Sequence, residues 1–478
     1  MCPTRAATID MLVDDVLLDI FDFCRNMYCI WHLSPPRFGA LWHILVHVCR
    51  RWRKIIFDSP RRLNLRILCT YGTPVRKHLG VWPAFPIDLQ FLFPIDLRPE
   101  DEDHAIAALE HRDRLHSVSL FAYGPQLAKF AALMQEPFPV LTELLLHSQC
   151  ENTPVLTAGF LGGSAPHLRA IILHCIPFPA LPTLLLSTSD LVILNLHDIP
   201  TPGYISPERM VESLAGLPRL KALTITFQDS ALRCDRIHTL PVTRPVLPAL
   251  TNFEFRGTFR YLEDFVAQID SPQLKRISII YWAQIDDVQL TLPQVSDFID
   301  RSIGPDLTPT THARVYLQQD RVTFTLSRDY DVSQGRYQRS VTITISHAEY
   351  KWLELSDLVS ALGHYSAALC TVVHLELDDE IQEGGHPDEW FHLFRHFPLI
   401  QTLHASVKLA EPVSVTLDLI TAEMVTEMLP SLGLICLEGE PVSSLENFVS
   451  ICRFSGHPIT VVETTEEFKE RFKSCVSI

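Results

Sequence analysis

One short phrase recurs along most of the chain and constrains its fold more than any other feature. The phrase is an apolar residue, two variable positions, a second apolar residue, one variable position and a third apolar residue. It starts at residues 115, 141, 168, 191, 220, 250 and 274, and again at 372, 400 and 432. The starts are 23 to 30 residues apart in the first run and 28 and 32 residues apart in the second. Such a period is typical of arrays in which each repeat supplies one strand and buries its apolar side chains only by stacking on its neighbours.

Helical stretches separate these phrases, as in "YLEDFVAQI", where Leu262, Phe265, Val266 and Ile269 share one helical face. Strand and helix are therefore expected to alternate, and the phrase resembles that of leucine-rich repeats. The resemblance implies an α/β fold, an irregular leucine-rich-repeat solenoid with the form of a horseshoe. Residues 280–371 interrupt the phrase with "RVTFTL", "SVTITI" and an apolar helical pattern around Trp352. We interpret this part as degenerate repeats, with an inserted hairpin as the alternative.

Charge is distributed unevenly along a folded, acidic chain. The 478 residues are 47% hydrophobic and 20% charged, with a net charge of −16. Residues 1–66 carry ten basic and six acidic side chains, whereas residues 373–478 carry six basic and 18 acidic ones, a net charge of −12. The two ends are expected to prefer partners of opposite sign.

Before the repeats, the sequence predicts two helices with apolar faces. Asp14 and Asp15 suit the start of the first, and residues 25–39 read as a loop. A second helix is expected over residues 40–57, with basic side chains on its solvated flank. The face of the first helix comprises Val16, Leu17, Ile20, Phe21 and Cys24, and that of the second comprises Leu41, Leu45, Val48, Cys49, Trp52, Ile55 and Ile56.

"MLVDDVLLDIF" followed by "HVCRRWRKIIFDSPRRL" resembles the two signature halves of an F-box. In that family the module docks a Skp-type adaptor and, through it, a cullin scaffold. With "SPRRLNL" directly after the second half, the sequence is similar to F-box proteins abundant in mushroom-forming fungi. Val13 stands where the family usually has Pro, and the loop is longer than usual. The resemblance implies an N-terminal helical F-box at residues 1–60, an array over 61–478, and adaptor contacts from Leu12, Val16, Leu17, Ile20, Phe21, Val48, Cys49, Trp52 and Ile55.

Two other interpretations of the N-terminal segment remain open. A nucleic-acid arm would also concentrate basic residues, but Trp52 lies on the apolar stripe rather than among solvated side chains available for base stacking. An unassigned helical cap on the array is the second alternative. We favour adaptor docking and expect no nucleic-acid partner.

Enzyme motifs are largely absent from the sequence, so we expect a protein that is not an enzyme and has no cofactor or metal. His392 and His396 lie four residues apart, a spacing that a metal site on a helix could use. Because the other face of this helix is apolar, we expect both histidines to be solvated residues on its flank rather than metal ligands. Every second residue of a strand faces the same side of the sheet. On this basis two sets of side chains are predicted on the concave face: a column of His147, His174 and His197, and the acids Glu376, Asp378 and Glu438.

The histidine column has three interpretations: contacts to a protein target, a metal site, or a run without function. The acids suggest that the target is basic. Twelve cysteines without paired spacing are typical of free thiols in a reducing compartment, the cytoplasm or nucleus. No apolar run reaches the length of a membrane span, and Cys475 in the terminal "CVSI" fits a prenylation motif only weakly.

Taken together, these features predict the substrate-recognition subunit of an SCF-type ubiquitin ligase, in which the F-box binds the adaptor and the repeats bind a protein target. The alternative is a leucine-rich-repeat interaction scaffold without ligase association.

Overall fold

The computed structural model forms two compact units, residues 1–191 and residues 192–478, which are described separately. The division into an F-box at 1–60 and an array at 61–478 stays a prediction. The structure describes the following residues: 9–30, 41–91, 99–149, 152–228, 244–283, 293–302, 312–318, 321–328, 330–331, 336–337, 339–347, 369–379, 387–439 and 445–464.

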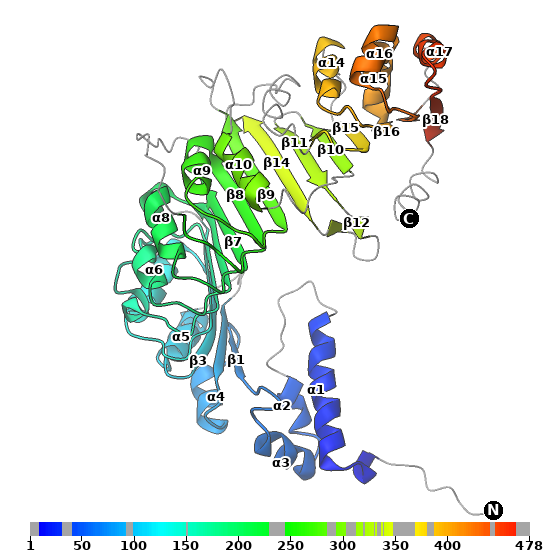
Figure 1. Ribbon diagram of the computed structural model, residues 1–478. Helices are drawn as coiled ribbons and strands as arrows, with labels where there is room; N and C mark the ends of the chain where they lie inside the picture. Colours follow the sequence, from blue (N-terminus) through cyan, green and yellow to red (C-terminus); the bar gives the residue numbers. More distant parts are fainter. Residues whose placement is uncertain are drawn as a thin grey trace, which may run out of the picture. The chain divides into compact units, whose positions relative to one another are not determined.

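Helices open the first unit (Figure 1). The helix predicted over residues 40–57 is two shorter helices, because Cys49 has an extended backbone and its Sγ accepts a hydrogen bond from the backbone nitrogen of Trp52, which starts the second helix. Residues 25–30, predicted as loop, instead continue the first helix. These elements are η1 (Ile9–Met11), α1 (Asp14–Ile30), α2 (Leu41–Leu45) and α3 (Arg50–Asp58).

A parallel sheet completes the first unit, with its strands in sequence order from β1 to β5. The strands are β1 (Ile67–Thr70), β2 (Ile87–Phe91), β3 (Leu115–Ala122), β4 (Glu143–Ser148) and β5 (Ala170–His174). The helices between and after them are α4 (Val75–Val81), α5 (Pro99–Leu109), α6 (Gly124–Leu133), η3 (Phe160–Gly163) and α7 (Leu181–Leu185).

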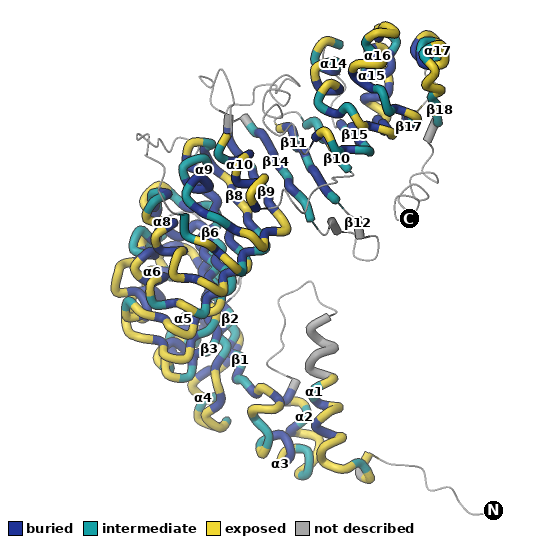
Figure 2. Tube along the Cα trace, viewed as in Figure 1, coloured by how far each residue is buried: buried dark blue, intermediate teal, exposed yellow. Residues whose placement is uncertain are grey.

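The recurring phrase explains this architecture. Its first apolar residue is buried ahead of the strand, as at Leu141 and Leu168, and the next two point from the strand into the core, as at Leu144 and Leu146. Buried and more exposed positions consequently alternate along the strands (Figure 2), while helices lie along one face of the sheet. All ten phrases overlap strands, so the predicted strand-and-helix repeat is confirmed. Strands β1 and β2 lack the phrase and were not predicted.

The second unit begins with the same alternation. Its strands β6 to β9 are parallel neighbours in sequence order. They are β6 (Ile193–Ile199), β7 (Ala222–Phe227), β8 (Asn252–Thr258) and β9 (Arg276–Ala283). The helices are η4 (Thr201–Gly203), α8 (Pro207–Leu214), α9 (Phe259–Val266) and α10 (Pro293–Ser302).

Antiparallel strands interrupt the repeat within residues 280–371. The sheet order continues from β9 through β14, β11 and β10 to β15, with β11 antiparallel to both neighbours. For these described strands the preference for degenerate repeats is therefore wrong, and inserted strands account for the break. Residues 348–368, which include the predicted helical pattern, lie outside the described residues. The strands are β10 (His312–Leu317), β11 (Arg321–Ser327), β14 (Ser340–His347) and a separate small pair, β12 (Tyr330–Asp331) with β13 (Arg336–Tyr337).

Parallel repeats then resume up to residue 464. Their strands are β15 (His374–Asp379), β16 (Thr402–Ala405), β17 (Leu434–Glu438) and β18 (Thr460–Thr464). Their helices are α14 (Pro387–Arg395), α15 (Val407–Asp418), α16 (Ala422–Met428) and α17 (Glu446–Phe454). The result is an α/β fold with a sheet dominated by parallel pairing, which resembles leucine-rich-repeat proteins; the horseshoe stays a prediction.

Cysteines contribute to the core of both units. Burial raises the pKa of Cys69 to about 12, and of Cys436 and Cys452 to about 11 each. Cys175 is disulfide-bonded, so the expectation of free thiols is wrong at that position.

Native-state alkylation is expected to distinguish buried from exposed thiols. Cys49 and Cys370 are exposed and free, whereas Cys69, Cys436 and Cys452 are buried. A pKa raised from 9.0 to about 11 lowers the thiolate fraction on the order of a hundredfold. Iodoacetamide followed by peptide mass spectrometry should label the exposed pair first and the buried three only after urea treatment. Equal labelling rates in the native protein would contradict this burial.

Candidate functional site

One face of α1 packs against α3 and forms the core of the N-terminal helices. Leu17 and Phe21 on α1 are buried, as are Ile55 and Ile56 on α3. The rings of Phe21 and Trp52 meet edge to face, with centroids 4.8 Å apart. This packing fixes the orientation of α1 relative to α3.

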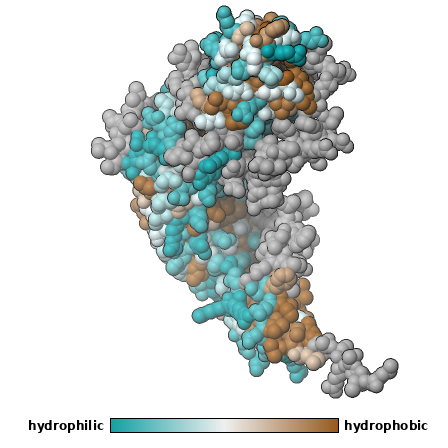
Figure 3. Space-filling model, turned by 45° about the vertical axis from the view of Figure 1, so that its right-hand side comes forward, coloured by the Kyte–Doolittle hydropathy of each residue, from teal (hydrophilic) through white to brown (hydrophobic). Residues whose placement is uncertain are grey.

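A second apolar face of α1 remains exposed. Val16, Ile20 and Phe23 follow one another at intervals of four and three residues, which places them along one side of the helix, and Val13 lies directly before its first residue. Their exposed fractions lie between 37 and 63%. Met11, Ile44 and Val48 are also exposed, and Figure 3 shows a hydrophobic patch over the N-terminal helices. We call these seven residues the apolar patch. Exposed apolar surface of this extent is typical of a site that a partner covers.

Several basic residues of this segment pair with acids of α1. Arg51 lies 2.6 Å from Asp14, and Arg62 lies 2.5 Å from Asp19 and 3.7 Å from Asp15. The Nε of Arg53 donates to the carbonyl oxygen of Val46 instead. Exposed pairs of this kind contribute about 0–1 kcal/mol each, so they orient the helices more than they stabilise them. The concentration of positive charge thus has a structural role within the N-terminal helices.

The predicted adaptor contacts divide into three groups. Val16, Ile20, Val48 and Cys49 are exposed; Leu12 and Trp52 are partly buried; Leu17, Phe21 and Ile55 are buried and hold the helices together. Contact with an adaptor stays a prediction for all nine. Sequence reasoning missed Met11, Val13, Phe23 and Ile44. The sequence did contain a signal for these residues: α1 has more apolar residues than one helical face can hold, and they lie along two faces.

The histidine column is partly assembled in the first unit. His147 on β4 pairs in register with His174 on β5, and their rings stack with centroids 4.1 Å apart and an interplanar angle of 10°. Phe121 on β3 stacks on His147 at 4.7 Å. These side chains are half-buried on the face that helices leave uncovered in the first unit. His197 lies on β6, in the second unit. Target contact by the three histidines stays a prediction.

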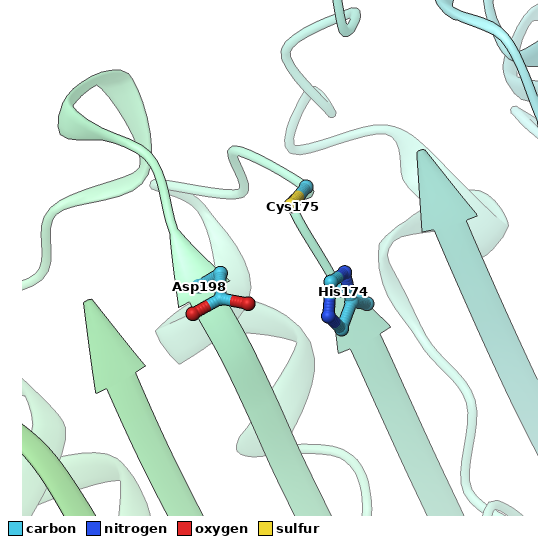
Figure 4. Close-up of side chains that lie close together, drawn as sticks. All are labelled: His174, Cys175 and Asp198. Atoms are coloured by element: carbon cyan, nitrogen blue, oxygen red, sulfur yellow. The ribbon is translucent and has the colours of Figure 1, made fainter. Parts of the chain in front are cut away.

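The geometry of the stacked pair does not suit a shared metal ion. Imidazole donates to a metal in the plane of its ring, and two nearly parallel rings direct their lone pairs side by side rather than toward one point. Figure 4 shows His174 at the end of β5, Cys175 directly after it and, on β6 of the second unit, Asp198. The sulfur of Cys175 is in a disulfide and is therefore not a thiolate ligand.

The predicted acids of the second unit have basic neighbours. Arg314 on β10 lies opposite Glu376 in register; its Nε is 3.7 Å from Glu376, and its Nη2 is 2.6 Å from Asp378. Glu438 lies 3.1 Å from the Nε2 of His404 on the neighbouring strand. The two contacts of Arg314 offset part of the negative charge of Glu376 and Asp378. Attraction of a basic target to Glu376, Asp378 and Glu438 stays a prediction.

Among the described helices, none is long and apolar enough to cross a membrane. No family model matches the chain, and no curated protein matches it. Among solved structures, it is similar to the leucine-rich-repeat-containing protein LegL7 from Legionella pneumophila, with 12% identity over 86% of this chain and 98% of that chain and a TM-score of 0.27. It is also similar to the Rad7 and Elc1 complex of yeast, with 13% identity over 95% of this chain and 94% of that chain and a TM-score of 0.29.

Proposed function

We propose that this protein is the substrate-recognition subunit of an SCF-type ubiquitin ligase. Its N-terminal helices bind a Skp-type adaptor, and the adaptor connects it to a cullin. The strands of its repeats bind a protein target. The subunit itself is not an enzyme and acts by bringing the target and the ligase together in the cytoplasm or nucleus.

The apolar patch is the observation that supports this proposal most directly. A helix that only capped the array would need one apolar face, yet α1 has two, and the second is exposed from Val16 to Phe23, with the exposed Val13 directly before the helix. The patch coincides with the segment that resembles an F-box. The alternative, an interaction scaffold without a ligase, leaves this second face without a role.

Direct binding tests the proposal. Purified full-length protein and a Skp-type adaptor should elute together in size-exclusion chromatography, and addition of a cullin should move the complex to larger size. The tagged protein should also precipitate adaptor and cullin from its host. If targets precipitate while adaptor and cullin are absent in both assays, the scaffold alternative is correct.

A further inference from the structure

Four neighbouring strands in the middle of the second unit contain arginines but no acid. In sheet order they are β9, β14, β11 and β10 (Figure 1). Apart from histidines, their only charged residues are Arg276, Arg321 and Arg314, although the whole chain has 56 acidic and 40 basic residues. Acids return on both bordering strands, β8 and β15. Positive charge is therefore concentrated on the inserted strands and β9.

The three arginines lie on one face of the sheet, opposite α9 and α10. Phe253 on β8 packs against aromatic rings of both helices. Arg276 is in register with Asn252, the residue before Phe253, and therefore points away from the helices. The register across β14, β11 and β10 places Arg321 and Arg314 on the same face. All three arginines are exposed, and we call this face of the four strands the basic face.

Short hydroxyl side chains occupy the middle of the basic face. Thr344 and Thr342 on β14 lie opposite Thr323 and Thr325 on β11. The hydroxyl oxygens are 3.1 Å apart in the pair of Thr323 with Thr344 and 3.4 Å apart in the pair of Thr325 with Thr342. Each pair uses one hydrogen and one lone pair, so each pair retains a donor and several acceptor positions. These hydroxyls can hydrogen-bond to the backbone N–H and C=O groups of an extended polypeptide.

Longer side chains flank the threonines on both sides. On β9, Trp282 has the guanidinium of Arg256 5.5 Å from its ring centroid. On β10, Tyr316 has the guanidinium of Arg314 5.8 Å from its ring centroid. Three strand spacings, about 14 Å, separate β9 from β10. This width matches one extended segment lying along β14 and β11 with its side chains directed toward both flanks.

We propose that the basic face binds an acidic, extended segment of the target protein. Carboxylates of the segment pair with Arg276, Arg321 and Arg314, and its backbone hydrogen-bonds to the threonine hydroxyls. The acids on β8 and β15 confine the acidic part of the segment to these four strands, because like charges repel. Only the description of the partner as a ligase target rests on the proposed function.

A single-stranded nucleic acid is the other polyanion that arginines could attract. Its bases would need exposed aromatic ring faces for stacking. Trp282 is only 7% exposed and lies under Arg256, and Tyr316 lies beside Arg314. A phosphate backbone that continued past β9 or β10 would also meet the acids of the bordering strands. The basic face therefore fits a short acidic protein segment better than a nucleic acid.

Binding of defined peptides to the full-length protein tests this inference. The probe is a fluorescein-labelled peptide of alternating glutamate and threonine, eight residues long like β14. Its neutral counterpart has glutamine in place of glutamate. Fluorescence anisotropy at low ionic strength should show about tenfold tighter binding of the glutamate peptide, and added salt should weaken that binding. Arg276→Gln and Arg321→Gln should each weaken it about threefold, and the double variant about tenfold.

Two further sets of variants control for general effects. Arg209→Gln removes the same charge from an exposed position on α8 in the same unit and should bind like wild type. Thr325→Lys and Thr325→Glu place long side chains of opposite charge at one position among the threonines. The glutamate peptide should bind the lysine variant more tightly than the glutamate variant, because a steric effect is shared by both.

The outcomes separate this inference from the proposed function. Equal binding of the two peptides, or unchanged binding in the double arginine variant, would overturn the proposal. Tighter binding of a single-stranded oligothymidine of the same length would overturn it in favour of a nucleic acid. The double arginine variant should still bind the adaptor, because the N-terminal helices are unchanged. Peptide binding and adaptor binding can therefore fail independently.

Discussion

Replacing Val16 and Ile20 together with aspartate is expected to abolish adaptor binding while leaving the N-terminal helices folded. Both side chains are exposed on the second face of α1, at 40 and 37%. A carboxylate buried without a partner in an apolar interface costs several kcal/mol, and each 1.4 kcal/mol weakens binding about tenfold. In the free protein the new carboxylates stay in water, and the change in helix propensity is within about 0.7 kcal/mol per residue.

Binding is measured by titration calorimetry with a purified Skp-type adaptor, and folding by circular dichroism and thermal unfolding. Leu133→Asp is the matched control, because Leu133 at the end of α6 is equally exposed, at 38%, but lies in the repeats. The control should bind like wild type. An unchanged affinity in the double variant would remove the apolar patch from the adaptor interface, and an equal loss in the control would point to a general effect of charge.

The repeats could be predicted because each one carries its own local signal. A strand of this array buries the same phrase against the same kind of neighbour, so the sequence period reports the structure directly. The inserted strands could not be placed in this way. "RVTFTL" and "SVTITI" alternate as strands should, yet the direction of β11 depends on pairing with β10 and β14, which no local pattern encodes.

The N-terminal helices show a different limit. The pattern of α1 identified most of its exposed and buried apolar residues up to Cys24, but missed Phe23 and merged two faces into one, because sequence spacing does not say which side another helix covers. The contact between Arg66 and His116 was missed for a related reason: both residues are ordinary in sequence, and a bulge between β2 and β3 brings them together. Trp42 was also overlooked, since it belongs to neither face expected for the helix over residues 40–57.

Trp42→Ala is expected to release α2 and α3 from the first strands. Trp42 is 7% exposed and has ring neighbours on both sides of this junction: Phe57 at 6.1 Å, Trp82 at 5.1 Å and Phe85 at 5.6 Å. Truncating a buried Trp to Ala costs about 3–5 kcal/mol, through lost burial and the cavity left behind. The hydrogen bond to Arg66 contributes a smaller share, about 0.5–1.5 kcal/mol.

Hydrogen exchange in the full-length protein reports where this loss occurs. Amides of α2, α3 and β1 should lose protection in Trp42→Ala, whereas those of β4 and β5, whose strands pair with each other, should keep it. Trp42→Phe keeps an aromatic ring but no donor and should have a much smaller effect. Val81→Ala is the control, because Val81 is 68% exposed at the end of α4. Loss of protection throughout β1 to β5 would mean that the junction stabilises the whole first unit, and unchanged protection would mean that the aromatic cluster does not hold the helices to the sheet.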